Sequence, residues 1–168
     1  MTEAEFRRVY GEYRDPLFRF GYRLTGSAET AEDLVHDCFV GLFRGGFREE
    51  RGSIGTYLFA SLRNLCRKQF RDSGREELSD DADGAVSEGG PLELLITGET
   101  CETVRNAVAR LPLLQREALI LFEYEELPLD EIARVVSADV GAVKSRLHRA
   151  RGTLRRVLAD SVGKEAAR

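Results

Sequence analysis

Six basic side chains lie close together near the C-terminal end of the sequence. Residues 140–158 contain one lysine, five arginines and no Asp or Glu. On a helix, the apolar residues of this stretch fall on one side, and the basic residues, with Ser145 and His148, occupy the rest. Like charges crowded on one exposed helix repel each other, so a polyanion is their natural complement. The alternative is a merely solvated helix, but the absence of compensating acids favours contact with DNA.

Acidic side chains are kept apart from this basic stretch. Residues 117–131 contain six Asp or Glu and no Lys or Arg, which predicts an oriented patch. The net charge of −4 is also uneven, being +1 over residues 1–73, −8 over residues 74–103 and +3 over residues 104–168. The acidity therefore belongs to the middle of the chain and does not argue against a nucleic-acid partner.

The residues that could support catalysis or bind a metal do not form a recognisable set. The two histidines, His36 and His148, are far apart in sequence, and neither a Ser/His/Asp or Cys/His grouping nor a phosphate-binding glycine motif occurs. His36 with Cys38 would be two metal ligands without a completing pair. Cys38, Cys66 and Cys101 match neither a disulfide framework nor a zinc signature. We expect reduced thiols, no cofactor and no enzymatic activity.

Helical spacing of apolar residues organises the first part of the chain. The clearest helix is expected from Ser27, as N-cap, to about Arg44. Two helices are expected upstream, separated at Asp15-Pro16, which reads as a cap followed by a first-turn proline. Another helix is expected over residues 53–71. The basic outer surface predicted near its end consists of Arg63, Arg67, Lys68 and Arg71.

The last part of the chain has the pattern of a helix-turn-helix. A helix is expected to begin near Pro112, and Leu127-Pro128 interrupts the pattern after it. A short helix over residues 130–136, a turn over residues 137–139 and a long helix over residues 140–158 follow. Two helices joined by a three-residue turn, the second strongly basic, are typical of DNA-binding proteins.

These patterns predict an all-α protein of two small helical domains, over residues 1–73 and 104–168. Residues 74–103 are rich in Gly, Ser, Asp and Glu and predict a flexible acidic linker. Leu92, Leu94, Leu95 and Ile96 within it could dock on a neighbour. No apolar run approaches the length of a membrane span, and the N-terminus is charged, so we expect a cytoplasmic protein without direct membrane insertion.

Both predicted domains resemble a known family. The stretches AEDLVHDCFVGLF (31–43), SIGTYLFASLRNLCRKQFR (53–71) and LPLLQREALILFEYEELPLDEIARVVSADVGAVKSRLHRARGTL (111–154) resemble the two conserved domains of sigma-70 family sigma factors. The most similar group is the small extracytoplasmic-function (ECF) sigma factors. The resemblance implies promoter-directed transcription initiation with core RNA polymerase. Relatives are commonly held inactive by an anti-sigma partner.

The resemblance also implies roles for particular residues of the first domain. Residues 33–37 look like the segment that docks on the largest polymerase subunit, with Asp33, His36 and Asp37 as contact candidates; His36 stands where relatives usually carry Gln. Residues 47–71 look like the part that melts and reads the minus-10 element. Tyr57 stands where relatives usually carry Trp, and Lys68 stands where many carry Asp. Tyr57 is expected in the core. The minus-10 DNA candidates are Arg51, Arg63, Asn64, Arg67, Lys68 and Arg71.

The long last helix looks like the reader of the minus-35 element in the major groove. Arginine can form paired hydrogen bonds to guanine, and Lys144 and Arg151 could equally hold phosphates. Ser137 replaces a common turn glycine, Ala138 replaces a larger apolar residue, and Asp139 is placed to cap the helix. The minus-35 DNA candidates are Lys144, Ser145, Arg146, His148, Arg149 and Arg151.

A stand-alone DNA-binding regulator is the main alternative, because the helix-turn-helix alone would suffice for it. That alternative leaves the docking segment and the basic helix of the first domain unexplained. A gel-shift assay separates the two, since a regulator retards promoter DNA alone whereas a sigma factor needs core polymerase. The acidic linker is expected to disfavour free DNA and to influence initiation.

Overall fold

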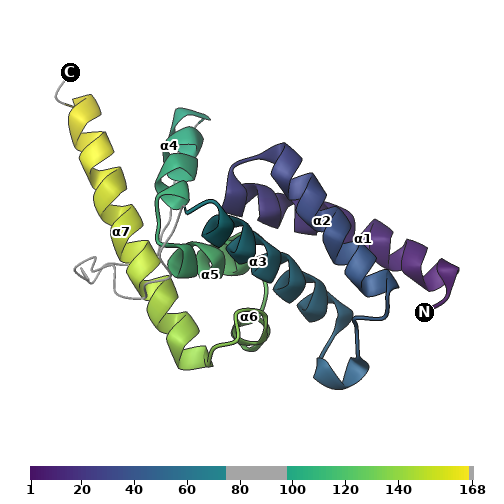
Figure 1. Cartoon of the computed structure of the whole chain (residues 1–168). Helices are drawn as coiled ribbons and strands as arrows, with labels where there is room; N and C mark the ends of the chain where they lie inside the picture. Colours follow the sequence, from purple (N-terminus) through teal and green to yellow (C-terminus); the bar gives the residue numbers. More distant parts are fainter. Residues whose placement is uncertain (75–97, 167–168) are drawn as a thin grey trace.

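The computed structural model describes residues 1–74 and 98–166, and this part of the chain consists of helices and turns without a strand (Figure 1). The prediction of an all-α fold is confirmed for it. The first helix group contains α1 (Glu3–Thr25), α2 (Ala28–Phe43), the short 3₁₀ helix η1 (Glu49–Arg51) and α3 (Ile54–Asp72). The second helix group contains α4 (Gly98–Ala109), α5 (Leu113–Glu123), α6 (Leu129–Val135) and α7 (Val140–Ala166).

Helix α1 is continuous, so the prediction of two helices separated at Asp15-Pro16 was wrong. Pro16 lies inside the helix, which begins with a capping box between Thr2 and Glu5. Proline removes one helical hydrogen bond, a local effect that favours a break. Burial on both sides of it outweighs that effect, because Val9 lies in the core before the proline and Phe20 after it.

Helices α2 and α3 begin close to the predicted positions, Ser27 caps α2 as predicted, and Ser53 caps α3. The Ser27 hydroxyl accepts a hydrogen bond from the Thr30 amide at 3.2 Å, and the Ser53 hydroxyl accepts one from the Thr56 amide at 3.1 Å. Each serine thus satisfies an amide that the first helical turn leaves without a partner. The fully buried side chains that hold this helix group together include Leu17, Phe20, Leu58 and Leu62.

The second helix group starts earlier than residue 104, the predicted start of the second domain. Helix α4 begins at Gly98, inside the range predicted to be linker, and its Val104, Ala107 and Val108 are buried. Burial of these apolar side chains stabilises a helix that composition alone did not predict. The linker residues expected to dock, 92–96, lie outside the described residues.

The helix-turn-helix forms as predicted. Helices α6 and α7 are joined by a turn in which Ser137 has a φ of +53°. An Asp139 side-chain oxygen accepts a hydrogen bond from the Ala142 amide at 2.7 Å, so Asp139 caps α7. Buried Val143 and Leu147 hold α7 to the rest of the group, and α7 continues past residue 158.

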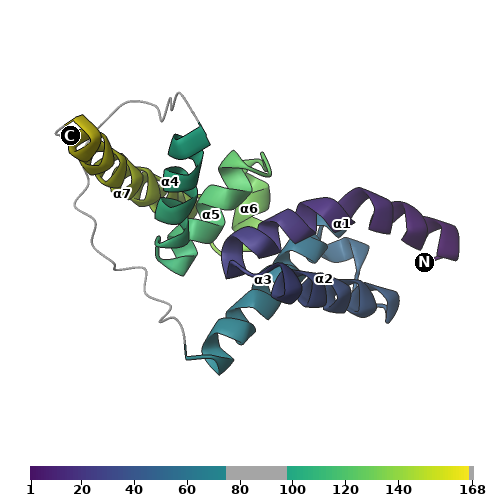
Figure 2. The same cartoon turned by 90° about the horizontal axis from the view of Figure 1, so that it is seen from above.

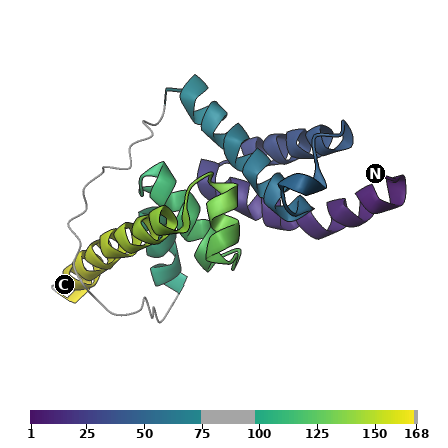
Figure 3. The ribbon, with the colours of Figure 1, turned by 90° about the horizontal axis from the view of Figure 1, so that it is seen from below.

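The two helix groups pack against each other. Helix α5 contacts α1, and α6 contacts α3. Seen from above and from below, α5 and α6 lie beside the first helix group, with α7 on their far side (Figures 2 and 3). Buried apolar residues of both groups belong to one hydrophobic cluster. The structure therefore brings together surfaces that the sequence assigns to separate domains.

Candidate polymerase and DNA interfaces

The predicted docking residues lie on one exposed face of α2. Asp33, His36 and Asp37 are exposed, whereas Leu34, Val35 and Cys38 of the same helix are buried. This pattern follows from the helical period, because residues 34, 35 and 38 lie on one side of α2, which faces α1 and α3. We call Asp33, His36 and Asp37 the docking face.

Aromatic side chains of α1 and α2 lie next to the docking face. Tyr10 and Phe39 have ring centroids 4.8 Å apart, and Phe6 meets Phe43 edge to face at 5.7 Å. Phe43 is 76% exposed, which is unusual for a large apolar side chain in a folded protein. A groove of about 200 Å³ is lined by residues that include Tyr10, Phe39 and His36. Exposed acids beside a groove with aromatic walls suit a protein partner.

A second groove lies between α1, the end of α2 and the loop that carries η1. Its volume is about 660 Å³, and its lining includes Arg8, Leu42, Phe47 and Ile54. Arg51 of η1 is exposed. The Phe47 and Tyr57 rings lie 5.7 Å apart, and Tyr57 packs against the core as expected. The loop thus offers an aromatic ring and arginines near an open hollow.

The basic face expected on α3 is only partly exposed. Asn64, Lys68 and Arg71 are exposed, and Arg67 is half-buried. Arg63 differs from the prediction, because its side chain is only 4% exposed and does not contribute to the outer surface. We call Asn64, Lys68 and Arg71 the α3 face.

Arg63 is buried because it pairs with Glu117 of α5. The Arg63 Nε donates to both carboxylate oxygens at 3.0 Å, and Nη2 donates to Oε1 at 2.9 Å. Such paired, charge-assisted hydrogen bonds are among the strongest that proteins form. The Glu117 side chain is 0% exposed, so this ion pair is shielded from water on both sides. It connects the two helix groups.

Further arginines act electrostatically on the same carboxylate. Burial raises the pKa of Glu117, while hydrogen bonds from Arg63 and the charges of Arg63, Arg67 and Arg146 oppose that rise. Burial also lowers the pKa of Arg67, and the like charge of Arg63 adds to the effect. Arg146 of α7 is buried, against the prediction of a base-contacting position on the outer surface. Glu117 therefore bonds Arg63 directly and is also affected by the positive charges of Arg67 on α3 and Arg146 on α7.

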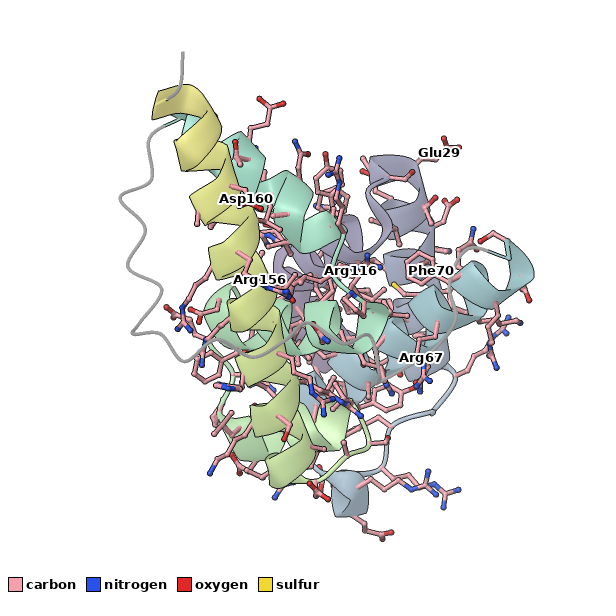
Figure 4. All side chains as sticks on the ribbon, turned by 90° about the vertical axis from the view of Figure 1, so that its left-hand side faces the viewer. Glu29, Arg67, Phe70, Arg116, Arg156 and Asp160 are labelled. Atoms are coloured by element: carbon pink, nitrogen blue, oxygen red, sulfur yellow. The ribbon has the colours of Figure 1, made fainter. Side chains whose placement is uncertain are left out.

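Two more contacts join the helix groups. The Arg23 guanidinium lies 4.1 Å from the centre of the Tyr124 ring, and its Nη1 lies 3.8 Å from Oε1 of Glu125. On the other side, the Arg116 guanidinium lies 5.7 Å from the centre of the Phe70 ring (Figure 4). These are cation–π contacts, whose strength grows as water is excluded.

The exposed side of α7 carries much of the predicted minus-35 set. Lys144, Ser145 and His148 are exposed, and Arg149 is half-buried. Arg151 is also half-buried, and its Nη2 donates to an oxygen of Glu123 at 3.0 Å. We call Lys144, Ser145 and His148 the α7 face.

Sequence reasoning missed the residues that join the helix groups. Glu117 was counted within an oriented acidic stretch, but it is buried, and the Glu125 side chain is only 5% exposed. A signal for Glu117 existed, because it lies between Leu114 and Leu121 at helical spacing and therefore on the apolar face of α5. No comparable signal identified Arg23, and nothing in the sequence indicated which arginine would meet Glu117.

Within the described residues, no group of three or more His, Cys, Asp or Glu could hold a metal ion. The same part of the chain has no helix both long and apolar enough to cross a membrane. The fold and its surfaces define a helical protein that combines a helix-turn-helix with a second basic helix and an acidic docking face.

Each of the two helix groups matches a known protein family. Residues 9–76 match the family Sigma-70 region 2, and residues 101–154 match Sigma-70, region 4. The chain is 34% identical to the ECF RNA polymerase sigma factor EcfG of Rhodopseudomonas palustris over 147 residues, which cover 84% of this chain and 78% of EcfG. The chain therefore belongs to the sigma-70 family of RNA polymerase sigma factors, in its ECF group.

The chain spans only about 60% of the length of two further relatives. It is 31% identical to ECF sigma factor SigE of Mycolicibacterium smegmatis over 88% of its own length, and 32% identical to BldN of Streptomyces coelicolor over 92%. The matches span 59% of SigE and 61% of BldN. Among solved structures, this chain is similar to the sigma factor RpoE in its complex with the anti-sigma factor NepR from Bartonella quintana. The TM-score is 0.70 and the sequence identity is 26%, and the match covers 92% of this chain and 97% of RpoE.

Proposed function

We propose that the chain binds core RNA polymerase and directs promoter-specific transcription initiation by reading minus-10 and minus-35 elements. The observation that carries the proposal is the presence of sigma regions 2 and 4 in order in one chain. The chemistry of the docking, α3 and α7 faces also fits it. Such a protein would act in the cytoplasm, where its proposed partners are, and its role would be specificity rather than catalysis.

The first helix group would hold the polymerase and the melted minus-10 element. Asp33, His36 and Asp37 would contact the polymerase, with the neighbouring aromatic groove supplying apolar area. Melting requires an unstacked base to be captured and a displaced strand to be held, for which aromatic and basic groups are suited. The groove beside Phe47 provides space for a base. The proposed minus-10 contacts are Arg51, Arg63, Asn64, Arg67, Lys68 and Arg71.

The second helix group would read the minus-35 element with α7 in the major groove. Ser145 and His148 could reach base edges, while Lys144 and Arg151 could hold phosphates. Arg146 and Arg149 complete the proposed set, although Arg146 would have to leave its buried position. Each helix group alone would bind DNA weakly, and polymerase would make the second contact effectively intramolecular by fixing the spacing.

An anti-sigma partner is part of the proposal. The related RpoE structure was solved with its anti-sigma factor NepR. In this chain, the exposed Phe43 and the groove next to the docking face could bind such a partner. Binding there would exclude polymerase, because both partners would need the same surface of α2.

The test of polymerase docking is a binding titration of labelled core polymerase with the full chain and its variants. The double variant Asp33→Asn/Asp37→Asn should weaken core binding by roughly 5- to 10-fold, since exposed charges each contribute up to about 1 kcal/mol. Glu29→Gln removes an exposed acid from the first turn of the same helix and is the matched control. Equal affinities for the wild type and the double variant would contradict the docking assignment.

A further inference from the structure

The loop between α2 and α3 forms one wall of the larger groove. We call residues 44–53 the η1 loop, and Figure 1 shows it projecting beyond the start of α3. The loop residues that line the groove are Gly45, Phe47, Glu49, Gly52 and Ser53. Within η1, the amides of Arg51 and Gly52 donate hydrogen bonds to carbonyls of the loop itself. These bonds shape the loop without fixing it to a helix, so the position of the wall depends on contacts at the ends of the loop.

At its start, the η1 loop runs directly against a tyrosine of α3. A Cβ at Gly46 would overlap the Tyr57 hydroxyl and would lie 2.8 Å from the Gly41 carbonyl oxygen. The Gly46 amide donates a hydrogen bond to that same carbonyl at 3.0 Å. The Tyr57 ring is itself held in place, because it packs against the core and lies 5.7 Å from the Phe47 ring. Cβ atoms essentially never come within 3.0 Å of such groups, so a side chain at position 46 would push the loop away from Tyr57.

At its end, the η1 loop is held by a second contact between a tyrosine and a glycine. A Cβ at Gly55, in the first turn of α3, would lie 2.9 Å from the ring of Tyr13 on α1. Tyr13 also packs against the core. Two tyrosines from different helices thus fix the η1 loop where it leaves α2 and where it enters α3.

We propose that Tyr57 is a positioning residue for minus-10 reading, whose hydroxyl against Gly46 sets the distance of the η1 loop from α1 and thereby selects the unstacked base that the larger groove accepts. This inference rests on the proposed function. The Tyr57 ring packs in the core as the sequence predicts, and the hydroxyl adds this second role. Hydrogen bonds to a base edge require donor–acceptor distances of about 2.7–3.2 Å, so a displacement of the loop by about 1 Å changes which base can be bonded.

Two single variants and their combination test the coupling between positions 46 and 57. Gly46→Ala forces the loop to move, and Tyr57→Phe removes only the hydroxyl against which the loop lies. In Gly46→Ala/Tyr57→Phe, the hydroxyl that the new Cβ would meet is gone, so the double variant should lose less base preference than the two single effects multiplied together. Gly41→Ala is the matched control for the glycine, because its Cβ would lie 3.6 Å from the Tyr57 hydroxyl, an ordinary contact distance. Tyr22→Phe, at an exposed tyrosine of α1, is the control for the hydroxyl.

The readout is base preference within the minus-10 element, measured by transcription from a promoter library with purified core polymerase and the full chain. A good paired contact to one base edge discriminates between bases by roughly 5- to 150-fold. Gly46→Ala should lower the preference for the favoured base at one minus-10 position by about fivefold or more, and Tyr57→Phe by about twofold or more, because a displaced wall no longer holds such paired bonds. Minus-35 preference and core affinity should stay at wild-type values, as should every readout for Gly41→Ala and Tyr22→Phe.

Failure of this proposal can be told from failure of the proposed function. If Gly46→Ala and Tyr57→Phe bind core polymerase like the wild type and keep its minus-10 base preference, the positioning role is wrong. An equal loss of preference at the minus-10 and minus-35 elements would also contradict it, because a merely structural contact predicts that pattern. If Gly46→Ala does not fold, as judged by circular dichroism, Tyr57→Phe alone decides between these results. A wild-type chain that directs no core-dependent initiation would instead refute the proposed function, and this inference with it.

Discussion

The turn of the helix-turn-helix contains a strained residue whose replacement should stabilise the protein. Ser137 has a φ of +53° between α6 and α7. In this left-handed region, the Cβ of a non-glycine residue raises the conformational energy of the folded state by about 1–2 kcal/mol, and glycine avoids that cost. Glycine in turn loses more conformational entropy on folding than other residues, which lowers the stability by about 0.5–1 kcal/mol. The difference predicts that Ser137→Gly raises the free energy of unfolding by about 0.5–1 kcal/mol.

The assay is a urea unfolding titration with circular dichroism as the signal, supported by a thermal scan. For a chain of this size, about 1 kcal/mol corresponds to a shift in Tm of roughly 2–4 °C. Ser137→Ala is the matched control, because it removes the hydroxyl but keeps the Cβ that causes the strain. We expect Ser137→Ala to stay within about 0.5 kcal/mol of the wild type. If Ser137→Gly is no more stable than Ser137→Ala, the strain argument is refuted.

Two further predictions concern local chemistry. Burial raises the pKa of Cys66 to about 12 and also raises the pKa of Cys38, so at pH 8 only about 10⁻⁴ of Cys66 is thiolate. Iodoacetamide should therefore modify half-buried Cys101 first, as detected by mass spectrometry. Earlier labelling of Cys66 in the folded protein would contradict this prediction. Asp139→Ala removes the side-chain oxygen that caps the Ala142 amide and should lower the free energy of unfolding by about 1 kcal/mol. Asp139→Asn keeps an oxygen that can accept this hydrogen bond and should retain most of the stability. Equal losses for the two variants in denaturant titrations would show that capping is not the cause.

Local features of this fold were predictable because they depend on neighbours in sequence. Ser27 and Ser53 begin helices, and Asp139 caps α7, since each side chain bonds an amide within the next turn. The exposure of Asp33, His36 and Asp37 followed from helical periodicity, whereas their docking role rests on the family resemblance. Pro16 shows the limit of local reasoning, because burial by distant helices keeps α1 intact there.

Long-range pairing was not predictable from the sequence. Periodicity could place Glu117 on the buried face of α5, but Arg63 is 54 residues away in the chain. Both residues looked like members of exposed charged stretches, and only the packing of the two helix groups brings them together. Roles of residues at the proposed DNA and polymerase contacts stay predictions, because they depend on partners.

The most direct test of the central claim is to map transcript 5′ ends produced by purified core polymerase with and without this chain on a promoter library. Selective start sites should appear only with the chain, downstream of two shared sequence elements at a constant spacing. Starts that are unchanged by the chain, or that lack a common pair of elements, would contradict the assignment of promoter recognition to its two helix groups.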